Sequence, residues 1–176
     1  MRCIIDIFKE MIPLIEGDVL PELQGVNPDI KGVYFEHGHF REINMSLNQK
    51  EETSLYDQKY PLIALFEDIR EQVDSNGVKE AELLIAICYN TRLDYKSKER
   101  HNNVIKPILT PVYKALMDRI NTNPHFIGYS FPHTKINRPY WGVRSVNEDS
   151  VQTIFDDILD AIEINIRIKY LENCKF

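Results

Sequence analysis

The chain has 176 residues, 43% of them hydrophobic, so it can bury one well-packed core but is too short for two sizeable domains. Its formal net charge of -6 and pI near 5.4 argue against a protein that wraps nucleic acid with a basic face, because phosphate contacts need clustered Lys and Arg. Cys3, Cys88 and Cys174 are widely spaced and form no CxxC pair, which favours free thiols in a reducing compartment over a disulfide scaffold, with Cys88 buried. We therefore expect a single domain over 1–176.

The first segment is amphipathic. Apolar residues from Cys3 to Ile15 recur at helical spacing, and Asp6, Lys9 and Glu10 interrupt them. These charges exclude the apolar core of a signal peptide, and no segment is expected to span a membrane. The spacing predicts a helix that Gly17 ends and that packs on a sheet.

Turn-forming residues dominate the next segment. Asp18 to Gly32 contains two prolines and two glycines, which predicts an irregular connection with at most a short strand. Val33 to Phe35 then favours a strand, and Arg41 to Leu47 alternates apolar and polar residues. We expect these two segments to form a hairpin that turns near Gly38.

Two apolar runs follow, separated by polar connectors. Asn48 to Lys59 is polar and is predicted to be a projecting connector. Tyr60 to Phe66 contains Pro61 near its start, a position that a strand tolerates. After a charged connector over Glu67 to Asn76, the segment Ala81 to Tyr89 has a core, Leu83 to Cys88, that is apolar without alternation. This core predicts the central strand, paired antiparallel with the strand before it.

The second half of the chain begins with a long helix over Ser97 to Ile120, kinked or restarted at Pro107 because an interior proline removes a backbone hydrogen bond. Phe126 to Phe131 and Ile136 to Val143 predict a second, aromatic hairpin. A polar link from Ser145 to Asp157 is predicted to hold a short helical turn. The last segment has the clearest strand pattern, with one buried and one wet face, and its apolar positions are Ile162, Ile164, Ile166, Ile168 and Tyr170.

Together these elements predict an α+β fold, an α/β sandwich in which a mostly antiparallel sheet carries the N-terminal helix and one long helix.

Candidate chemistry is sparse. His37 and His39 are two residues apart beside Glu36, a spacing that on a strand directs both imidazoles to one side, yet without a third ligand nearby we expect no metal. No phosphate-binding glycine loop, GxSxG or HExxH motif occurs, so we expect neither a cofactor nor a catalytic residue. Asp156, Asp157 and Asp160 are candidates for a cation site, but they lack the alternating oxygen ligands and the closing Glu of a calcium loop. A second group could stack on bases or sugars, but it has no flanking basic residues, so we expect it in the core or a protein interface: Phe126, Tyr129, Phe131, Tyr140 and Trp141.

The order of several short motifs is distinctive. Tyr-Pro-Leu-Ile-Ala-Leu at 60–65 is followed by an apolar strand ending in Asn90-Thr91. A helix then carries Glu99-Arg100, Lys-Pro-Ile-Leu at 106–109 and Pro-Val-Tyr at 111–113, and Asp-Asp-Ile-Leu-Asp-Ala-Ile-Glu at 156–163 precedes the last strand. This order, from about Ile4 to Leu171, resembles the neck and tail-terminator proteins of tailed bacteriophages, most closely the ring-forming neck proteins of crAss-like and related phages.

The resemblance implies a non-enzymatic structural protein of the virion, made in the host cytoplasm. Its subunits would form a homo-oligomeric ring in the neck or tail as a head–tail connector. The implied partners are the portal and other neck or tail proteins, with DNA passing through the lumen without sequence-specific binding. The alternatives are a small soluble metal- or nucleotide-dependent enzyme, or a monomeric adaptor that binds a partner through the aromatic hairpin.

Exposed polar segments that are not needed for the core are the expected assembly contacts, because a partner can offset the entropy cost of ordering them. The candidate contact residues are Glu36, His37, His39, Arg41, Gln49, Lys50, Glu51, Glu52, Arg92, Asp94 and Lys96.

Overall fold

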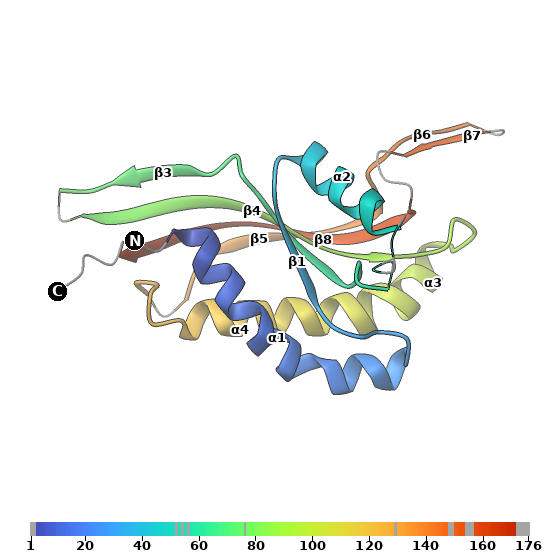
Figure 1. Ribbon diagram of the computed structural model, residues 1–176, viewed down its shortest axis with the longest axis horizontal. Coiled ribbons are helices and arrows are strands. Elements are labelled where there is room, and N and C mark those ends of the chain that lie inside the picture. The colour runs from blue at the N-terminus through green and yellow to red at the C-terminus, as the bar shows by residue number, and fades with distance from the viewer. Residues whose placement is uncertain are drawn as a thin grey trace.

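A six-stranded sheet forms the centre of the computed structural model (Figure 1). The structure describes residues 3–51, 53, 55, 57–75, 77–128, 130–147, 150–153 and 157–171, with the backbone alone at 51, 144–147, 150–153 and 171. The strands follow the order β1 (Tyr34–Gly38), β2 (Leu62–Phe66), β4 (Val78–Asn90), β8 (Leu159–Leu171) and β5 (His133–Trp141), with β3 (Arg70–Val73) paired to β4. The β1–β2 pair is parallel, and the other pairs are antiparallel.

The central strand is confirmed as β4. From Ile85 to Cys88 its apolar run is buried on both faces, with Ile85 and Ile87 facing one core and Ala86 and Cys88 facing the other, whereas Leu84 is 38% exposed. A strand covered on both sides needs no alternation, which explains the continuous run in the sequence. Burial among apolar groups raises the pKa of the Cys88 thiol, and Cys88 and Cys3 are free thiols.

The C-terminal strand is confirmed as β8, which pairs with β4 along its whole length. All five predicted apolar positions are buried, whereas Asn165, Arg167 and Lys169 between them are exposed. The buried positions face the main core, and the polar positions between them face the other side of the sheet.

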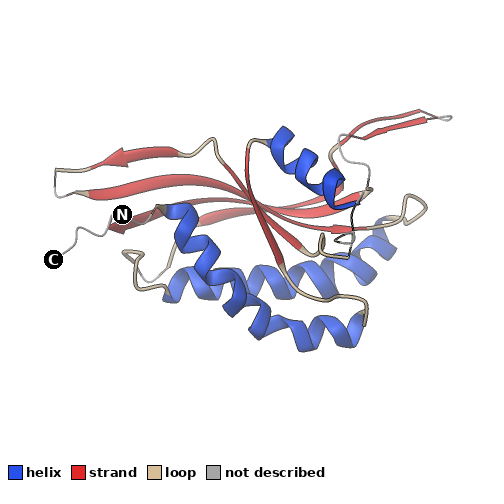
Figure 2. Cartoon of the chain, in the orientation of Figure 1, coloured by secondary structure: helices blue, strands red, loops and turns tan. Residues whose placement is uncertain are grey.

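That helical layer consists of α1 (Ile4–Val26) and a long segment made of α3 (Ser97–Arg100), the π-helix η1 (His101–Leu109) and α4 (Thr110–Thr122) (Figure 2). The prediction that Gly17 ends the first helix is wrong, because α1 continues to Val26 through the expected irregular connection. Val19 and Leu23 extend its buried stripe, and the apolar contact they make outweighs the cost of an exposed glycine and of Pro21 within the helix.

The long helix is confirmed, and Pro107 changes its winding. Residues His101–Leu109 adopt π-helical bonding around Pro107, so that the helix widens at the residue that has no N–H to donate. Pro111 lies in the first turn of α4, where proline is tolerated.

The first predicted hairpin is wrong. After β1 the chain forms α2 (Phe40–Glu51), which buries Ile43 and Leu47 and leaves Met45 52% exposed. Ile43 and Leu47 are four residues apart, which places both on one face of a helix. Residues four apart also lie on one face of a strand, so the alternating sequence pattern fits either structure. The helix covers a second, smaller core on the opposite face of the sheet from α1 (Figure 1).

Three other predicted segments differ from the structure. The predicted hairpin over 126–131 and 136–143 is not formed: β5 pairs with β8, and Phe126 makes only an isolated bridge to Tyr170. The link predicted to hold a helical turn contains a β-hairpin of β6 (Val143–Asn147) and β7 (Ser150–Thr153). The polar connector over 48–59 begins inside α2, and its Lys59 is buried.

The predicted α+β class is confirmed, since a mostly antiparallel sheet carries an N-terminal helix and one long helix. Among the described helices none combines the length and the apolar character that crossing a membrane requires.

Candidate functional site

The predicted assembly contacts lie in two places in the fold. Six of them belong to β1, to α2 or to the corner between them: Glu36, His37, His39, Arg41, and Gln49 and Lys50 in the last turn of α2. Arg92, Asp94 and Lys96 belong to the loop between β4 and α3. Glu51 is described by its backbone alone, and Glu52 lies outside the described residues.

At the β1–α2 corner, charged side chains tie the strand to the helix that follows it. Glu36 accepts hydrogen bonds from Ser46 Oγ at 3.0 Å and from Lys50 Nζ at 2.6 Å. His37 Nδ1 lies 2.7 Å from Glu67 Oε1, at the end of β2. The contacts of Glu36 hold α2 over the sheet. The carboxylates of Glu36 and Glu67 both have hydrogen-bond partners within the subunit.

The two histidines of this corner have separate roles. Gly38 adopts φ +138°, so the chain leaves the strand before His39. The His39 N–H donates to Glu42, and its Nδ1 accepts from the Arg41 N–H, which closes the first turn of α2. Within the described residues, no group of three or more His, Cys, Asp or Glu side chains could hold a metal ion.

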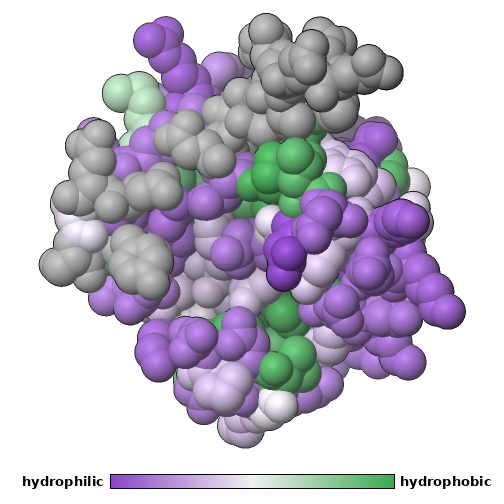
Figure 3. Space-filling model, turned by 90° about the vertical axis from the view of Figure 1, so that its right-hand side faces the viewer, coloured by the Kyte–Doolittle hydropathy of each residue, from purple (hydrophilic) through white to green (hydrophobic). Residues whose placement is uncertain are grey.

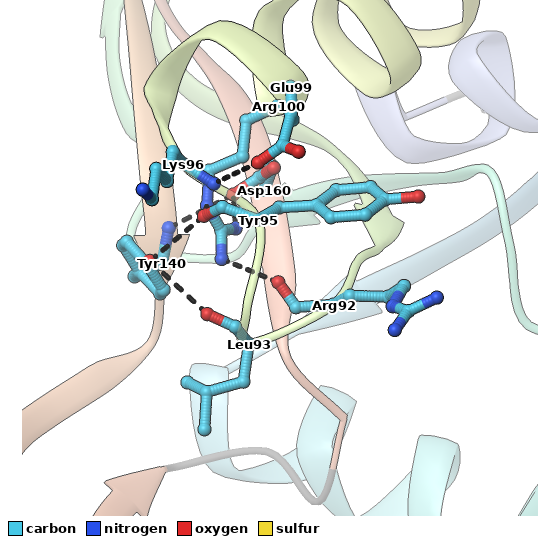
Figure 4. Close-up of polar contacts among 8 residues, drawn as sticks. All are labelled: Arg92, Leu93, Tyr95, Lys96, Glu99, Arg100, Tyr140 and Asp160. Carbon is cyan, nitrogen blue, oxygen red and sulfur yellow. Dashed lines mark hydrogen bonds and ion pairs between the residues drawn. The ribbon is translucent and has the colours of Figure 1, made fainter.

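The loop after β4, residues 91–96, is held from beneath by one buried guanidinium (Figure 4). Arg100 is 1% exposed and donates from Nε to the Tyr95 carbonyl at 2.9 Å and from Nη2 to the Arg92 carbonyl at 2.7 Å. Its Nη1 donates to Asp160 Oδ1 at 2.6 Å, and Asp160 is fully buried. The carboxylate compensates the buried charge, and the two loop carbonyls accept from two further N–H donors.

Tyr140 completes this arrangement (Figure 4). Its ring lies 3.5 Å from the Arg100 guanidinium carbon, and its hydroxyl contacts the carbonyls of Leu93 and Tyr95. Tyr140 has φ +53°, unusual for a residue with a side chain, and its N–H donates to Asp160 across a bulge between β5 and β8. The bulge therefore aims Tyr140 at the loop.

The carbonyls of residues 92, 93 and 95 point inward, and the side chains of Arg92, Leu93, Asp94 and Lys96 are exposed. Leu93 is 47% exposed, and beside it Arg92 forms a surface ion pair with Asp94. The loop is a preorganised projection with an apolar residue between charged ones. Among the residues of this site, sequence analysis named Arg92, Asp94 and Lys96 as contacts, considered Asp160 and Tyr140 only for other roles, and gave Arg100 none. In the sequence, Asp160 indicates a buried polar site, because it is an acidic residue on the otherwise apolar face of the β8 pattern.

The β6–β7 hairpin projects from the same end of the molecule (Figure 1). It is a separate two-stranded sheet, and among the described strands β6 and β7 pair with each other alone. Seen from this end, the surface has several apolar areas set among hydrophilic ones (Figure 3). A groove of about 500 Å³ lies beside the loop, lined in part by Asn27, Tyr89 and Asn102.

The aromatic residues weighed as one surface are divided among three environments. Phe126 and Phe131 pack in the main core, Trp141 packs edge-on against Phe40 in the second core, and Tyr140 covers Arg100. Tyr129 lies outside the described residues.

The aspartates weighed as a cation site are also separated. Asp160 binds Arg100, and Asp157 accepts hydrogen bonds from Lys59 and Tyr60. Asp156 lies outside the described residues.

Neither the protein-family models nor the curated proteins that were compared with the chain match it.

Proposed function

We propose that this protein is a structural subunit that joins copies of itself into a ring in the neck or tail of a tailed-phage virion, around the channel through which DNA passes. It connects portal and tail proteins and carries out no catalysis. The order of motifs that resembles ring-forming neck proteins supports this proposal, as does the α+β architecture expected from that resemblance.

The observation that carries the proposal is the projecting β6–β7 hairpin. An isolated two-stranded hairpin is at best marginally stable in water, because it has too little apolar surface to bury and two unpaired edges. This one projects from the body of the subunit as a sheet of its own. A neighbouring protein supplies the contacts that such an arm lacks.

An arm that reaches a different surface of the next copy makes a head-to-tail contact. Contacts of this kind generate closed rings when the rotation between copies closes, and open filaments when it does not. A ring is the closed assembly that fits a subunit surrounding a channel.

The loop over 91–96 supports the same role. Arg100 and Tyr140 hold its carbonyls before any partner arrives, so docking Leu93 against a neighbour costs little further ordering. The net charge of -6 is also suited to a channel through which DNA slides, because acidic walls do not bind phosphates.

The test is the oligomeric state of the purified protein. Mass photometry and negative-stain electron microscopy are expected to show closed rings. Replacing residues 144–153 by a Gly-Ser linker is expected to give folded monomers with an unchanged near-ultraviolet circular dichroism spectrum. The control inserts the same linker at Gly77, in the turn between β3 and β4, and is expected to assemble normally.

Wild-type protein that stays monomeric at high concentration contradicts the ring. If that monomer also binds a nucleotide or a metal ion in calorimetry, the enzyme alternative is favoured. If it instead binds one phage protein with a 1:1 ratio, the adaptor alternative is favoured.

A further inference from the structure

The receiving surface for the arm can be sought among the free edges of the sheet. Within the described chain β1 pairs with β2 alone, so its other edge has no strand partner. The Tyr34 N–H donates to the Pro61 carbonyl at 2.9 Å, and the Gly38 carbonyl accepts from the Glu67 N–H at 3.2 Å. These two bonds show which residues of β1 direct their backbone groups toward β2.

In a parallel pair, alternate residues direct both N–H and C=O to the same neighbour. Tyr34, Glu36 and Gly38 therefore face β2, and the backbone groups of Phe35 and His37 point away from it. Both of these residues are only half-buried, and their rings stack with centroids 6.0 Å apart. The outer edge of β1 thus offers two N–H donors and two carbonyl acceptors to an incoming strand.

The other edges of the sheet are protected against such pairing. Edge strands commonly avoid unwanted partners through proline, lysine and bulges. β5 contains Lys135 and Pro139 and has a bulge between Arg138 and Trp141. β3 has four exposed residues, and Arg70 and Glu71 are charged.

β1 has neither lysine nor proline, since its sequence is Tyr-Phe-Glu-His-Gly. Its one carboxylate, on Glu36, is engaged by Lys50 and Ser46 of α2. The least protected edge is therefore also the one that carries Glu36 and His37, two of the predicted assembly contacts.

The arm has the dimensions that this edge requires. β6 spans five residues, as β1 does, and the hairpin has two outer edges that no described strand occupies. Resting on the proposed ring function, we propose that the β6–β7 hairpin of one copy adds as a strand pair to the β1 edge of the next copy. The sheet then continues across the subunit boundary through backbone hydrogen bonds to Phe35 and His37.

Arm and edge are different parts of one chain, so the contact is head-to-tail and each subunit both gives and receives a hairpin. Backbone pairing supplies the bonds, and the half-buried Phe35 and His37 rings provide an adjacent apolar surface that an added strand covers further.

The test compares two substitutions at one position. His37→Pro removes the outward N–H of residue 37. Because that N–H does not bond to β2, the substitution leaves the β1–β2 hydrogen bonds in place. His37→Ala removes the same imidazole and its contact with Glu67 but keeps the N–H. We expect His37→Pro to raise the protein concentration needed for half-assembly at least tenfold and His37→Ala to change it less than threefold, with both variants folded by circular dichroism.

Hydrogen exchange gives the second readout on the full-length protein. The Phe35 and His37 amides are expected to exchange rapidly in dilute monomer and to become protected in the assembled ring, while amides of β3 and β5 keep their monomer rates. Wild-type rings with unprotected β1 amides, or a His37→Pro variant that assembles like wild type, overturn the edge contact and leave the ring standing. Wild-type protein that never assembles overturns the ring itself.

Discussion

At the scale of single residues, Arg100 is a charged side chain that lies buried in the fold. Four contacts converge on its guanidinium: a buried carboxylate, two loop carbonyls and the face of Tyr140. The Arg100 charge and the Asp160 carboxylate are each costly to bury alone, and their ion pair offsets that cost, although Asp160 Oδ2 is buried without a hydrogen-bond partner. The arrangement couples the end of β4, the start of the long helix and the β5–β8 bulge.

Asp160→Asn should strongly destabilise the protein. The substitution keeps the shape of the side chain but leaves the Arg100 charge buried without a counter-charge, and breaking a buried pair in this way costs about 3–5 kcal/mol. Urea unfolding followed by fluorescence measures this loss as a lower midpoint. The matched control is Asp94→Asn, which removes the exposed partner of Arg92 and should leave the midpoint unchanged. Equal midpoints for the two variants would show that Asp160 is not needed to balance Arg100.

A second pair connects the two long helical segments and predicts a dependence on pH. Arg119 Nε and Nη2 donate to the two carboxylate oxygens of Asp18 at 2.7 and 2.6 Å. These hydrogen bonds hold the pKa of Asp18 below its ordinary value of 3.8, against a smaller opposing effect of desolvation. A carboxyl group with a lowered pKa in the folded state stabilises above its unfolded pKa, and this contribution disappears as pH falls through the folded value.

Asp18→Asn should therefore lower the melting temperature slightly at pH 7, and the difference from wild type should vanish as pH falls below 3.8. Differential scanning calorimetry at a series of pH values measures it. Because both side chains are partly exposed, added salt should also reduce the difference at pH 7. A difference that persists at the lowest pH would assign the effect to something other than the carboxylate charge.

At the scale of elements, β8 is the strand on which the main core depends, since it lies between β4 and β5 and its apolar side faces the helices. Ile166 on that side is 2% exposed, and Asn165 beside it faces the opposite, exposed side. Ile166→Asp should unfold the subunit, because an unpaired carboxylate among apolar side chains costs several kcal/mol, comparable with the stability of a whole domain.

The matched control for this strand is Asn165→Asp, which introduces the same side chain one position away and should leave the protein folded. Circular dichroism melts of the two variants give the comparison. A cooperative transition for Ile166→Asp at the wild-type temperature would show that this face of β8 is not buried.

At the scale of the whole molecule, the loop over 91–96 and the hairpin extend from one end of the subunit (Figure 1). If the loop contributes to contacts between subunits, Leu93→Asp should impair assembly and leave the fold unchanged, because Leu93 is 47% exposed and its carbonyl, not its side chain, contacts Tyr140. The control is Leu14→Asp on α1, since Leu14 is 51% exposed. Mass photometry of the two variants at equal concentration decides: equal assembly of both would exclude Leu93 from the interface.

The sequence by itself determined the strands that are buried along their length and the helices whose apolar stripe is long. β4 and β8 were predictable because a two-sided or one-sided core leaves a local pattern in the side chains. The α+β class followed from these elements.

Tertiary structure decided the segments in which local pattern is ambiguous. Ile43 and Leu47 suit either a strand face or a helix face, and only their contact with the second core selects the helix. Gly17 does not end α1, because packing of Val19 and Leu23 extends the helix beyond it.

The antiparallel pairing of β2 with β4, which follow each other closely in the chain, was predicted, but contacts between more distant segments were not. Arg100 and Asp160 are sixty residues apart, and their contact depends on the register of β8 with β4 and on the bulge at Tyr140. The edge position of β1 depends likewise on the order of strands in the sheet. Backbone groups left free at an edge leave no mark in the side-chain pattern, so the sequence could suggest Glu36 and His37 as contacts, and only the fold shows which backbone groups there face outward.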